Sequence, residues 1–392
     1  MPDIPGYGGN LFAEEGILDP YRHYRAIRDL APVVQLREPD LLAVGRYDDV
    51  RAVLGDHETF VSGQGVLLND VANKLTRGTT LASDPPLHDH LKKVVAHRLT
   101  PRALRDERNS IEAKADALVR RVLDLDVVDG VADLAQAMPM SVVPDFLGFP
   151  EDCRPHLLTW AEGAIEAGAP VSDRTPAAVA AATELGSYAV GLVENRGLLP
   201  GSLGDDVLAA AYRGEVSAEQ CPALLLDYFG PSMETTISAL GSALALFAEH
   251  PEQWDLLRAN PALVTGAFNE VVRLESPLRG FTRVAARDTA IGGLPVPAGA
   301  RVLVLFASAN RDERKWDGPE VFDITRRNAD HLGLGYGVHY CAGQGLARLE
   351  VTAVLTALAA SVTRIELAGE PARWISGMAR AYTSLPLRLH GA

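Results

Sequence analysis

The stretch that most constrains this chain runs from His331 to Arg348 and joins a glycine-rich loop to a helix around one cysteine. Glycines alternate with larger residues at 333, 335 and 337, and good helix formers follow. Cys341 lies at the junction, where unpaired backbone N–H groups of a helix start favour a negatively charged sulfur. Nearby glycines let the backbone fold closely around that sulfur. The stretch therefore favours a thiolate that can ligate a soft metal, although a lone buried cysteine in a tight turn gives a similar local pattern.

This loop resembles the haem-binding loop of cytochromes P450, whose pattern is Phe-Gly-x-Gly-x-His-x-Cys-x-Gly. Leu334 takes the place of the phenylalanine, and five residues match in register: Gly335, Gly337, His339, Cys341 and Gly343. In the family the cysteine is the axial thiolate of haem b (iron protoporphyrin IX), which favours O–O cleavage. The resemblance implies that Cys341 is the iron ligand and that His339 and Gly343 also bind the cofactor.

A long apolar segment from about 222 to 250 carries a second motif. Its length predicts a helix of ~40 Å, and Pro231 in its middle predicts a kink because it removes a backbone N–H. Glu234 and Thr235 follow in otherwise apolar surroundings, which indicates function. The pair resembles the acid and alcohol that relay protons in P450s, so we expect both to be catalytic, although Pro231 and Ser232 depart from the family's small residues. The alternative is a hydroxyl that only bonds the preceding turn.

Three basic residues outside the loop match family positions that bind haem propionates. His88 and Lys92 lie one turn apart on a predicted helix, with lysine where the family has arginine. Arg283 lies in an extended segment after a later helix. A lone histidine–lysine pair more often marks a solvated helix face, so the assignment of these residues to the cofactor depends on the resemblance.

The expected fold class is mainly α with small β-sheets (α+β), and the resemblance implies the cytochrome P450 fold as one domain over residues 1–392. Helices are expected at about 100–275 and 340–362, and β-rich parts at about 35–70, 278–306 and 363–392. Glu270 and Arg273 match the family's Glu-x-x-Arg pattern. Arg326 would complete a buried ion-pair triad that supports the loop around Cys341.

Residues from three parts of the chain are expected to line a pocket for a small hydrophobic or aromatic substrate. They are Val66, Leu67, Leu226, Gly230, Leu278, Phe281 and Thr282.

Composition restricts the partners and the compartment. The formal net charge of −14 argues against nucleic acid and anionic membrane surfaces. Three widely separated cysteines fit a reducing cytoplasm. The start, Met1-Pro2-Asp3-Ile4-Pro5, has no leader pattern, and the apolar run at 177–182 is too short to cross a membrane. We therefore expect a cytoplasmic protein without a membrane partner.

The resemblance implies a haem-thiolate monooxygenase that uses O₂ and electrons from NAD(P)H. The chain shows neither a flavin motif nor an iron–sulfur cysteine set, so a separate ferredoxin or flavin/iron–sulfur reductase is expected to deliver the electrons. The segments 62–66, 227–232 and 279–282 resemble bacterial aryl-ether O-demethylases of the guaiacol type. This resemblance implies O-demethylation in aromatic compound catabolism. The alternatives are C–H hydroxylation of a terpene, fatty acid or polyketide, a peroxide-driven enzyme, and a non-catalytic haem sensor or carrier.

Overall fold

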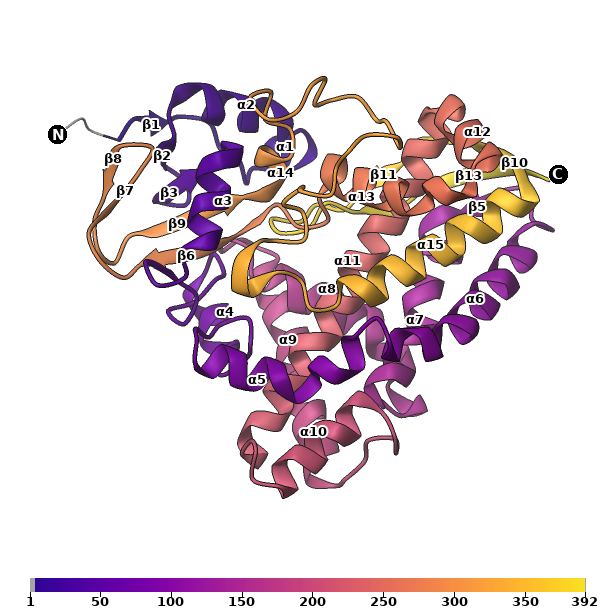
Figure 1. Ribbon diagram of the computed structural model, residues 1–392, viewed down its shortest axis with the longest axis horizontal. Coiled ribbons are helices and arrows are strands. Elements are labelled where there is room, and N and C mark those ends of the chain that lie inside the picture. The colour runs from indigo at the N-terminus through magenta and orange to yellow at the C-terminus, as the bar shows by residue number, and fades with distance from the viewer. Residues whose placement is uncertain (1–3, 392) are drawn as a thin grey trace.

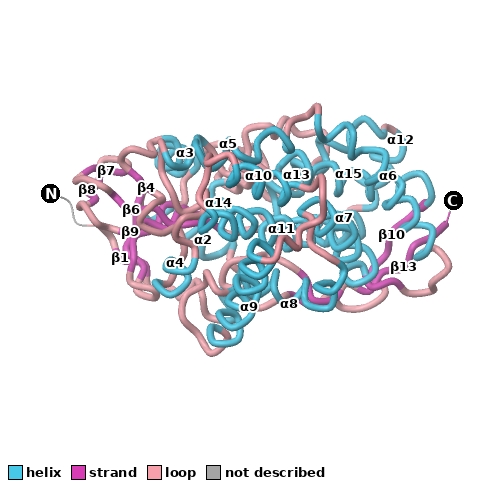
Figure 2. The backbone as a smooth tube through the Cα atoms, turned by 90° about the horizontal axis from the view of Figure 1, so that it is seen from below, coloured by secondary structure: helices cyan, strands magenta, loops and turns pink. Residues whose placement is uncertain are grey.

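The computed structural model describes residues 4–391, so part of the N-terminal stretch judged to lack a leader lies outside the described residues. Helices fill the middle of the molecule, and strands gather near the two ends of its long axis (Figures 1 and 2). The expected class, mainly α with small sheets, is confirmed.

The α-helices occur where long runs of apolar residues recur at helical spacing. Their bounds are α1 Glu14–Leu18, α2 Tyr21–Leu30, α3 Tyr47–Gly55, α4 Asp70–Leu75, α5 Leu87–Ala96, α6 Ala103–Val122, α7 Ala137–Leu147, α8 Leu157–Glu166, α9 Thr175–Glu194, α10 Leu203–Tyr212, α11 Cys221–Glu249, α12 Pro251–Ala259, α13 Val264–Glu275, α14 Phe306–Ala309 and α15 Gln344–Ser361.

The strands form one larger sheet and three small ones. Their bounds are β1 Gly6–Tyr7, β2 Val33–Leu36, β3 Leu41–Val44, β4 Phe60–Val61, β5 Val128–Asp129, β6 Gly280–Ala285, β7 Thr289–Ile291, β8 Leu294–Val296, β9 Arg301–Leu305, β10 Val362–Leu367, β11 Ala372–Arg373, β12 Tyr382–Ser384 and β13 Pro386–Gly391. The six-stranded sheet has the order β1-β2-β3-β9-β6-β4, in which β6 and β9 are antiparallel and β3 and β9 are parallel.

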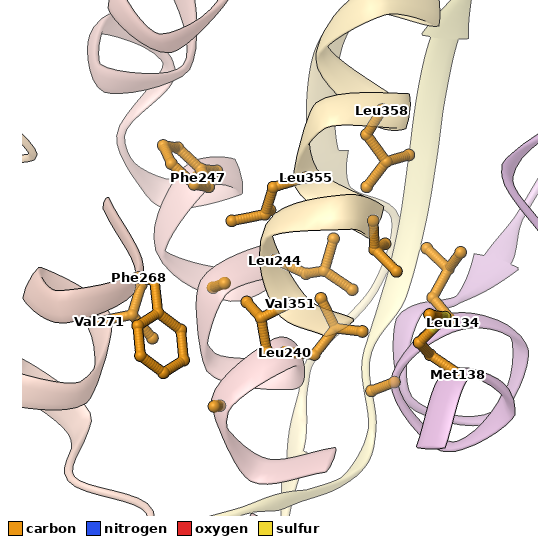
Figure 3. Packing of buried hydrophobic residues seen from close by; sticks show 14 of the residues in the cluster. Leu134, Met138, Leu240, Leu244, Phe247, Phe268, Val271, Val351, Leu355 and Leu358 are labelled. Carbon is orange, nitrogen blue, oxygen red and sulfur yellow. The ribbon is translucent and has the colours of Figure 1, made fainter. Parts of the chain in front are cut away.

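Helix α11 crosses the interior and packs against α7, α8, α9, α13 and α15. Pro222 stands in its first turn, where a missing N–H costs nothing. Its C-terminal half is buried on nearly all sides, and Leu240, Leu244 and Phe247 meet Val351 and Leu355 of α15 in the main core (Figure 3). Burying each such side chain stabilises the fold by ~1.5–3 kcal/mol. This packing makes α11 a rigid support for the polar residues on its N-terminal half.

The expected ion-pair triad forms at the end of α13. Glu270 and Arg273 are fully buried, and their side chains meet through two bonds of 2.8 and 2.9 Å. Arg326 donates from Nε to Glu270 at 3.1 Å. Arg273 also donates to the carbonyl oxygens of Asn310 and Pro319, at 2.8 Å each. The triad therefore ties α13 to the irregular segment that leads toward Cys341.

Helix α9 contains the apolar run at 177–182, which the sequence analysis judged too short to cross a membrane, but the helix itself is longer than this run. Among residues 4–391, α9 is the one helix long and apolar enough, by length and composition, to cross a membrane. It packs on α8 and α11. A single apolar helix is weak evidence for a membrane span, because helices that pack within a fold can have the same composition.

Glu350 on α15 generates a test of stability. Its carboxyl group is buried in the main core, and neither oxygen has a hydrogen-bond partner among the described residues. Burial raises the pKa of Glu350 from 4.5 to about 8. The unfolded chain therefore loses this proton at lower pH than the folded chain, and the free energy of unfolding falls as pH rises from about 4.5 to about 8.

We expect Glu350→Met to raise the free energy of unfolding by ~1–3 kcal/mol at pH 8, and by less at pH 5, because it removes an unpartnered buried polar group. Urea unfolding at both pH values measures the change. Glu370→Gln, at an exposed position, should leave both values unchanged. The same pH dependence in Glu350→Met and the wild type would contradict the assignment.

Candidate functional site

The Cys341 loop folds back on itself before α15 begins. The Cys341 N–H donates to the Leu334 carbonyl at 2.9 Å. Gly335 and Gly337 have φ of 75° and 72°, the left-handed region that favours glycine. A Cβ at Gly337 would lie only 2.7 Å from the Leu54 carbonyl oxygen, so no larger residue fits there without movement. The glycine spacing of the sequence is therefore a geometric requirement of this turn.

The sulfur of Cys341 lies where α15 begins. Burial raises the pKa of the Cys341 thiol, whereas hydrogen bonds from the backbone N–H groups of Gly343 and Gln344 act to lower it. These donors suit a sulfur that carries negative charge when a metal binds it. Leu334, which replaces the family's phenylalanine, is partly buried against the main core.

His339 and His88 form the centre of a basic group beside the loop. Their ring centroids lie 4.5 Å apart. The Nε2 atom of His339 is buried and has no hydrogen-bond partner among the described residues. Burial and the nearby cations, Arg283 foremost among them, lower the pKa of His339 to about 3. An unpartnered buried nitrogen among basic groups indicates that an acceptor belongs there.

Arg283 and Lys92 complete this basic group from β6 and α5. Arg283 is buried and donates from Nη1 to the Thr282 carbonyl at 2.8 Å. Lys92 donates from Nζ to the Val338 carbonyl at 2.9 Å. Within the described part of the chain, neither forms a salt bridge with a carboxylate. A buried arginine and a half-buried lysine without anionic partners fit a ligand with carboxylate groups, such as haem with its propionates.

Glu234 and Thr235 lie on α11 after the internal proline. The Thr235 hydroxyl donates to the Pro231 carbonyl at 2.6 Å, which is the structural contact that the sequence left open as an alternative to a catalytic role. Glu234 is buried and forms no salt bridge with the described residues. Burial, with a smaller contribution from the Glu162 carboxylate on α8, raises the pKa of Glu234 to about 8. Glu234 therefore holds a proton at neutral pH.

Four of the expected pocket residues come together in one apolar cluster, and three do not. Val66, Leu67, Leu278 and Phe281 share this cluster with Ile165, Ala169, Met378 and Ala379, and we name these eight residues the apolar cluster. Leu226 packs instead with the residues of α8, α9 and α11, and a Cβ at Gly230 would lie 2.9 Å from the Ala164 side chain.

Thr282, expected at the edge of the pocket, is fully buried and holds a loop in place. Its N–H donates to the Val66 carbonyl at 2.7 Å, and its hydroxyl donates to the Leu67 carbonyl at 3.3 Å. The same hydroxyl accepts from Nη1 of Arg301 at 2.8 Å. Its hydrogen-bonding capacity is thus used within the protein.

Two polar residues at the apolar cluster were not singled out from the sequence. Asn69 donates from Nδ2 to the carbonyls of Ala167 and Ala169 at 2.6 and 2.7 Å, and so ties the α8–α9 turn to the loop before α4. Asp227 on α11 accepts from the Thr80 N–H at 2.5 Å. The signals for Asp227 in the sequence were an acid within an apolar helix segment and its place in the segment 227–232 that resembles aryl-ether O-demethylases.

A hollow of about 400 Å³ lies beyond the loop, between α6, α13 and α15. Arg108, Glu112 and Asp116 of α6 and Gly345 and Arg348 of α15 are among its lining residues. It is therefore close to Cys341 along the chain and separate from the apolar cluster.

Comparison with known proteins covers nearly the whole chain. A family profile described as Cytochrome P450 matches residues 202–360. CYP199A2 of Rhodopseudomonas palustris is 36% identical over 98% of this chain and 95% of its own length. Cytochrome P450 130 of Mycobacterium tuberculosis is 30% identical over 99% of this chain and 100% of its own length.

Solved structures agree with this match. P450BioI superposes with a TM-score of 0.88 at 26% identity, over 96% of this chain and 100% of the other. Cytochrome P450 CREJ superposes with a TM-score of 0.88 at 27% identity, over 95% and 98%. The chain therefore belongs to the cytochrome P450 family, has its mainly helical fold, and is a cytochrome P450 monooxygenase whose family implies a haem-thiolate centre.

Proposed function

We propose that this monooxygenase removes the methyl group of a small methoxylated aromatic compound. One oxygen atom from O₂ enters a methoxy C–H bond, and two electrons and two protons convert the other oxygen atom to water. The resulting hemiacetal collapses to a phenol and formaldehyde. The observation that carries this proposal is the small apolar cluster, in which Leu278 and Phe281 pack with Val66 and Leu67.

The residues around Cys341 fit the cofactor that the family implies. Cys341 would ligate the iron of haem b, with Gly343 keeping the backbone close to the sulfur. His339, Arg283, His88 and Lys92 would bind the propionates. Bound haem supplies the activation of O₂, and the protein positions the substrate and controls access of water and protons.

Glu234 and Thr235 would deliver protons on the α11 side of the site. Because burial keeps Glu234 protonated at neutral pH, its carboxyl group can donate a proton toward the Thr235 hydroxyl. That hydroxyl rests on the Pro231 carbonyl at 2.6 Å and can rotate to donate into the site instead. A proton from the Glu234 carboxyl group would then replace the proton that the Thr235 hydroxyl has donated.

Electrons would come from NAD(P)H through a separate ferredoxin or flavin/iron–sulfur reductase in the cytoplasm. We place the docking of this partner near the Cys341 loop, on the side where the hollow beside Arg108 and Arg348 lies.

A second candidate function is C–H hydroxylation of a terpene, steroid or polyketide. Relatives named steroid C26-monooxygenase and linalool 8-monooxygenase are 28% and 29% identical to this chain. A relative named 6-deoxyerythronolide B hydroxylase is 31% identical. The CYP109E1 structure holds testosterone, which favours this second candidate, whereas the CREJ structure holds an aromatic ligand, (4-ethylphenyl) dihydrogen phosphate, which favours an aromatic substrate.

The substrate class is tested with purified holoenzyme, a reductase and NADH. We expect guaiacol or syringol to shift the spin state of the haem and to yield one formaldehyde per phenol formed, because both place a methoxy group on a small apolar ring. Linalool serves as the matched hydroxylation probe. The O-demethylase proposal would be contradicted if every methoxyphenol gave neither a spin-state shift nor formaldehyde. A hydroxylated product from linalool in the same assay would support the second candidate function.

The role of Thr235 is tested by Thr235→Ala. Loss of the hydroxyl should lower the amount of product formed per NADH consumed by roughly tenfold. NADH consumption should continue, because the substitution impairs proton delivery but leaves the electron supply intact. Thr183→Ala is a matched control, because the exposed Thr183 on α9 makes the same hydroxyl bond to a carbonyl four residues earlier, at 2.7 Å. Equal coupling in Thr235→Ala and the wild type would leave Thr235 a structural residue only.

The role of Glu234 is tested by pH. Because its pKa is about 8, we expect product per NADH in the wild type to fall between pH 7 and 9, as the carboxyl loses its proton. Glu234→Gln should be slower by roughly 10²-fold at pH 7 and should lack this fall. Glu162→Gln should move the midpoint to lower pH, since it removes a like charge. A fall that persists in Glu234→Gln would assign the titration to another group.

A further inference from the structure

Asp227 places a carboxylate on α11 immediately beside the apolar cluster. It lies one turn before Gly230 and accepts from the backbone N–H groups of Thr80 and Leu81 at 2.5 and 3.4 Å. Leu81 in turn packs against the apolar cluster. Asp227 therefore occupies two adjacent backbone donors in the segment that packs against the apolar cluster.

These two donors are the kind of group that would bind a carboxylate on a ligand. Adjacent backbone N–H groups at a turn form an anion-binding site. In this chain the side chain of Asp227 fills that site, so an incoming anion meets a negative charge instead of donors. Glu234, further along α11, is a second acid on the same helix.

Two of the arginines near the apolar cluster in sequence, Arg301 and Arg283, are engaged elsewhere. Arg301 donates to the carbonyls of Gly65 and Gln64 and to the Thr282 hydroxyl. Arg279 donates from Nη2 to the Ile17 carbonyl at 2.7 Å, and its Nε and Nη1 atoms have no partner among the described residues. Arg283 belongs to the basic group around His339. An anionic substrate in the apolar cluster would be buried close to the Asp227 carboxylate, which is strongly unfavourable.

We propose that Asp227 is a specificity-determining residue that restricts this enzyme to uncharged aromatic ethers and rejects aromatic carboxylates. The inference deepens the proposed function and takes the position of the substrate from it. Asp227 acts in two ways. It repels a carboxylate, and it occupies the Thr80 and Leu81 donors that could otherwise bind one. Burial raises the pKa of Asp227 to about 6, so the side chain is charged at pH 8.

The test compares two probes of nearly the same shape, 4-methoxybenzamide and 4-methoxybenzoate, which differ in charge. Calorimetry on the holoenzyme at pH 8 gives the dissociation constant of each. We expect the wild type to bind the amide at least about tenfold more tightly. In Asp227→Ala, which frees both donors, the ratio of the two constants should move at least about tenfold toward the benzoate.

Asp227→Asn separates the repulsion by charge from the occupation of the two donors, and its side chain has the same shape as that of Asp227. It removes the charge but keeps an acceptor, so the ratio should move in the same direction by a smaller factor. Glu219→Gln, at an exposed position before α11, removes one charge from the protein and should leave the ratio unchanged. Equal binding of both probes to the wild type would overturn the proposal. An unchanged ratio in Asp227→Asn would also overturn it, even if Asp227→Ala does not fold.

A failure of the proposed function can be distinguished from a failure of the role of Asp227, because binding and turnover are measured separately. A ratio that shifts in the variants supports the role of Asp227 even if neither probe releases formaldehyde with NADH and a reductase. Formaldehyde from the amide without any shift of the ratio supports O-demethylation and overturns the role of Asp227.

Discussion

The structure around Cys341 depends on the buried ion pair of Glu270 and Arg273. A buried ion pair is stable only when nearly all of its hydrogen-bonding capacity is used. Here Arg273 donates to the carbonyls of Asn310, Pro319 and Val321, while Glu270 accepts from Arg326 and Asn328. The irregular segment 310–328, which contains neither a strand nor a long helix, is thereby held against α13. Because this segment leads directly into the Cys341 loop, the pair sets where the sulfur lies.

Helix α11 links the stability of the core to the chemistry of the site. Its C-terminal half contributes Leu240 and Leu244 to the main core (Figure 3). Its N-terminal half carries Asp227 and Glu234, whose burial is unfavourable and raises both pKa values. The apolar packing of one half offsets the cost of the acids on the other. One rigid helix can therefore hold the proposed proton donor, Glu234, and the proposed specificity residue, Asp227, at defined positions.

Features that rest on local chemistry were predictable. The apolar length of the α11 segment and its early proline predicted 222–250, and the helix spans Cys221–Glu249. The glycines before Cys341 predicted a tight turn, because positive φ and close backbone approach are local requirements. Four of the seven expected pocket residues entered one cluster, since large apolar side chains bury together wherever the fold permits. Thr282 did not follow, because the use of its hydroxyl depends on Arg301 and Leu67, which are distant in sequence.

The sequence by itself determined the type of fold, the family, and a cysteine at a helix start with an acid–alcohol pair on an apolar helix. These depend on residue type, spacing and helix periodicity. Only the tertiary structure decided that Asp227 is bound to Thr80 and Leu81, that His339 keeps an unpartnered nitrogen beside His88, and that Lys92 reaches Val338. The two residues in each of these contacts are more than 140 residues apart in the sequence. The Nε2 atom of His339 lacks a partner because the fold buries it. The physical reason is that a polar group's partner is chosen by packing, which local sequence does not encode.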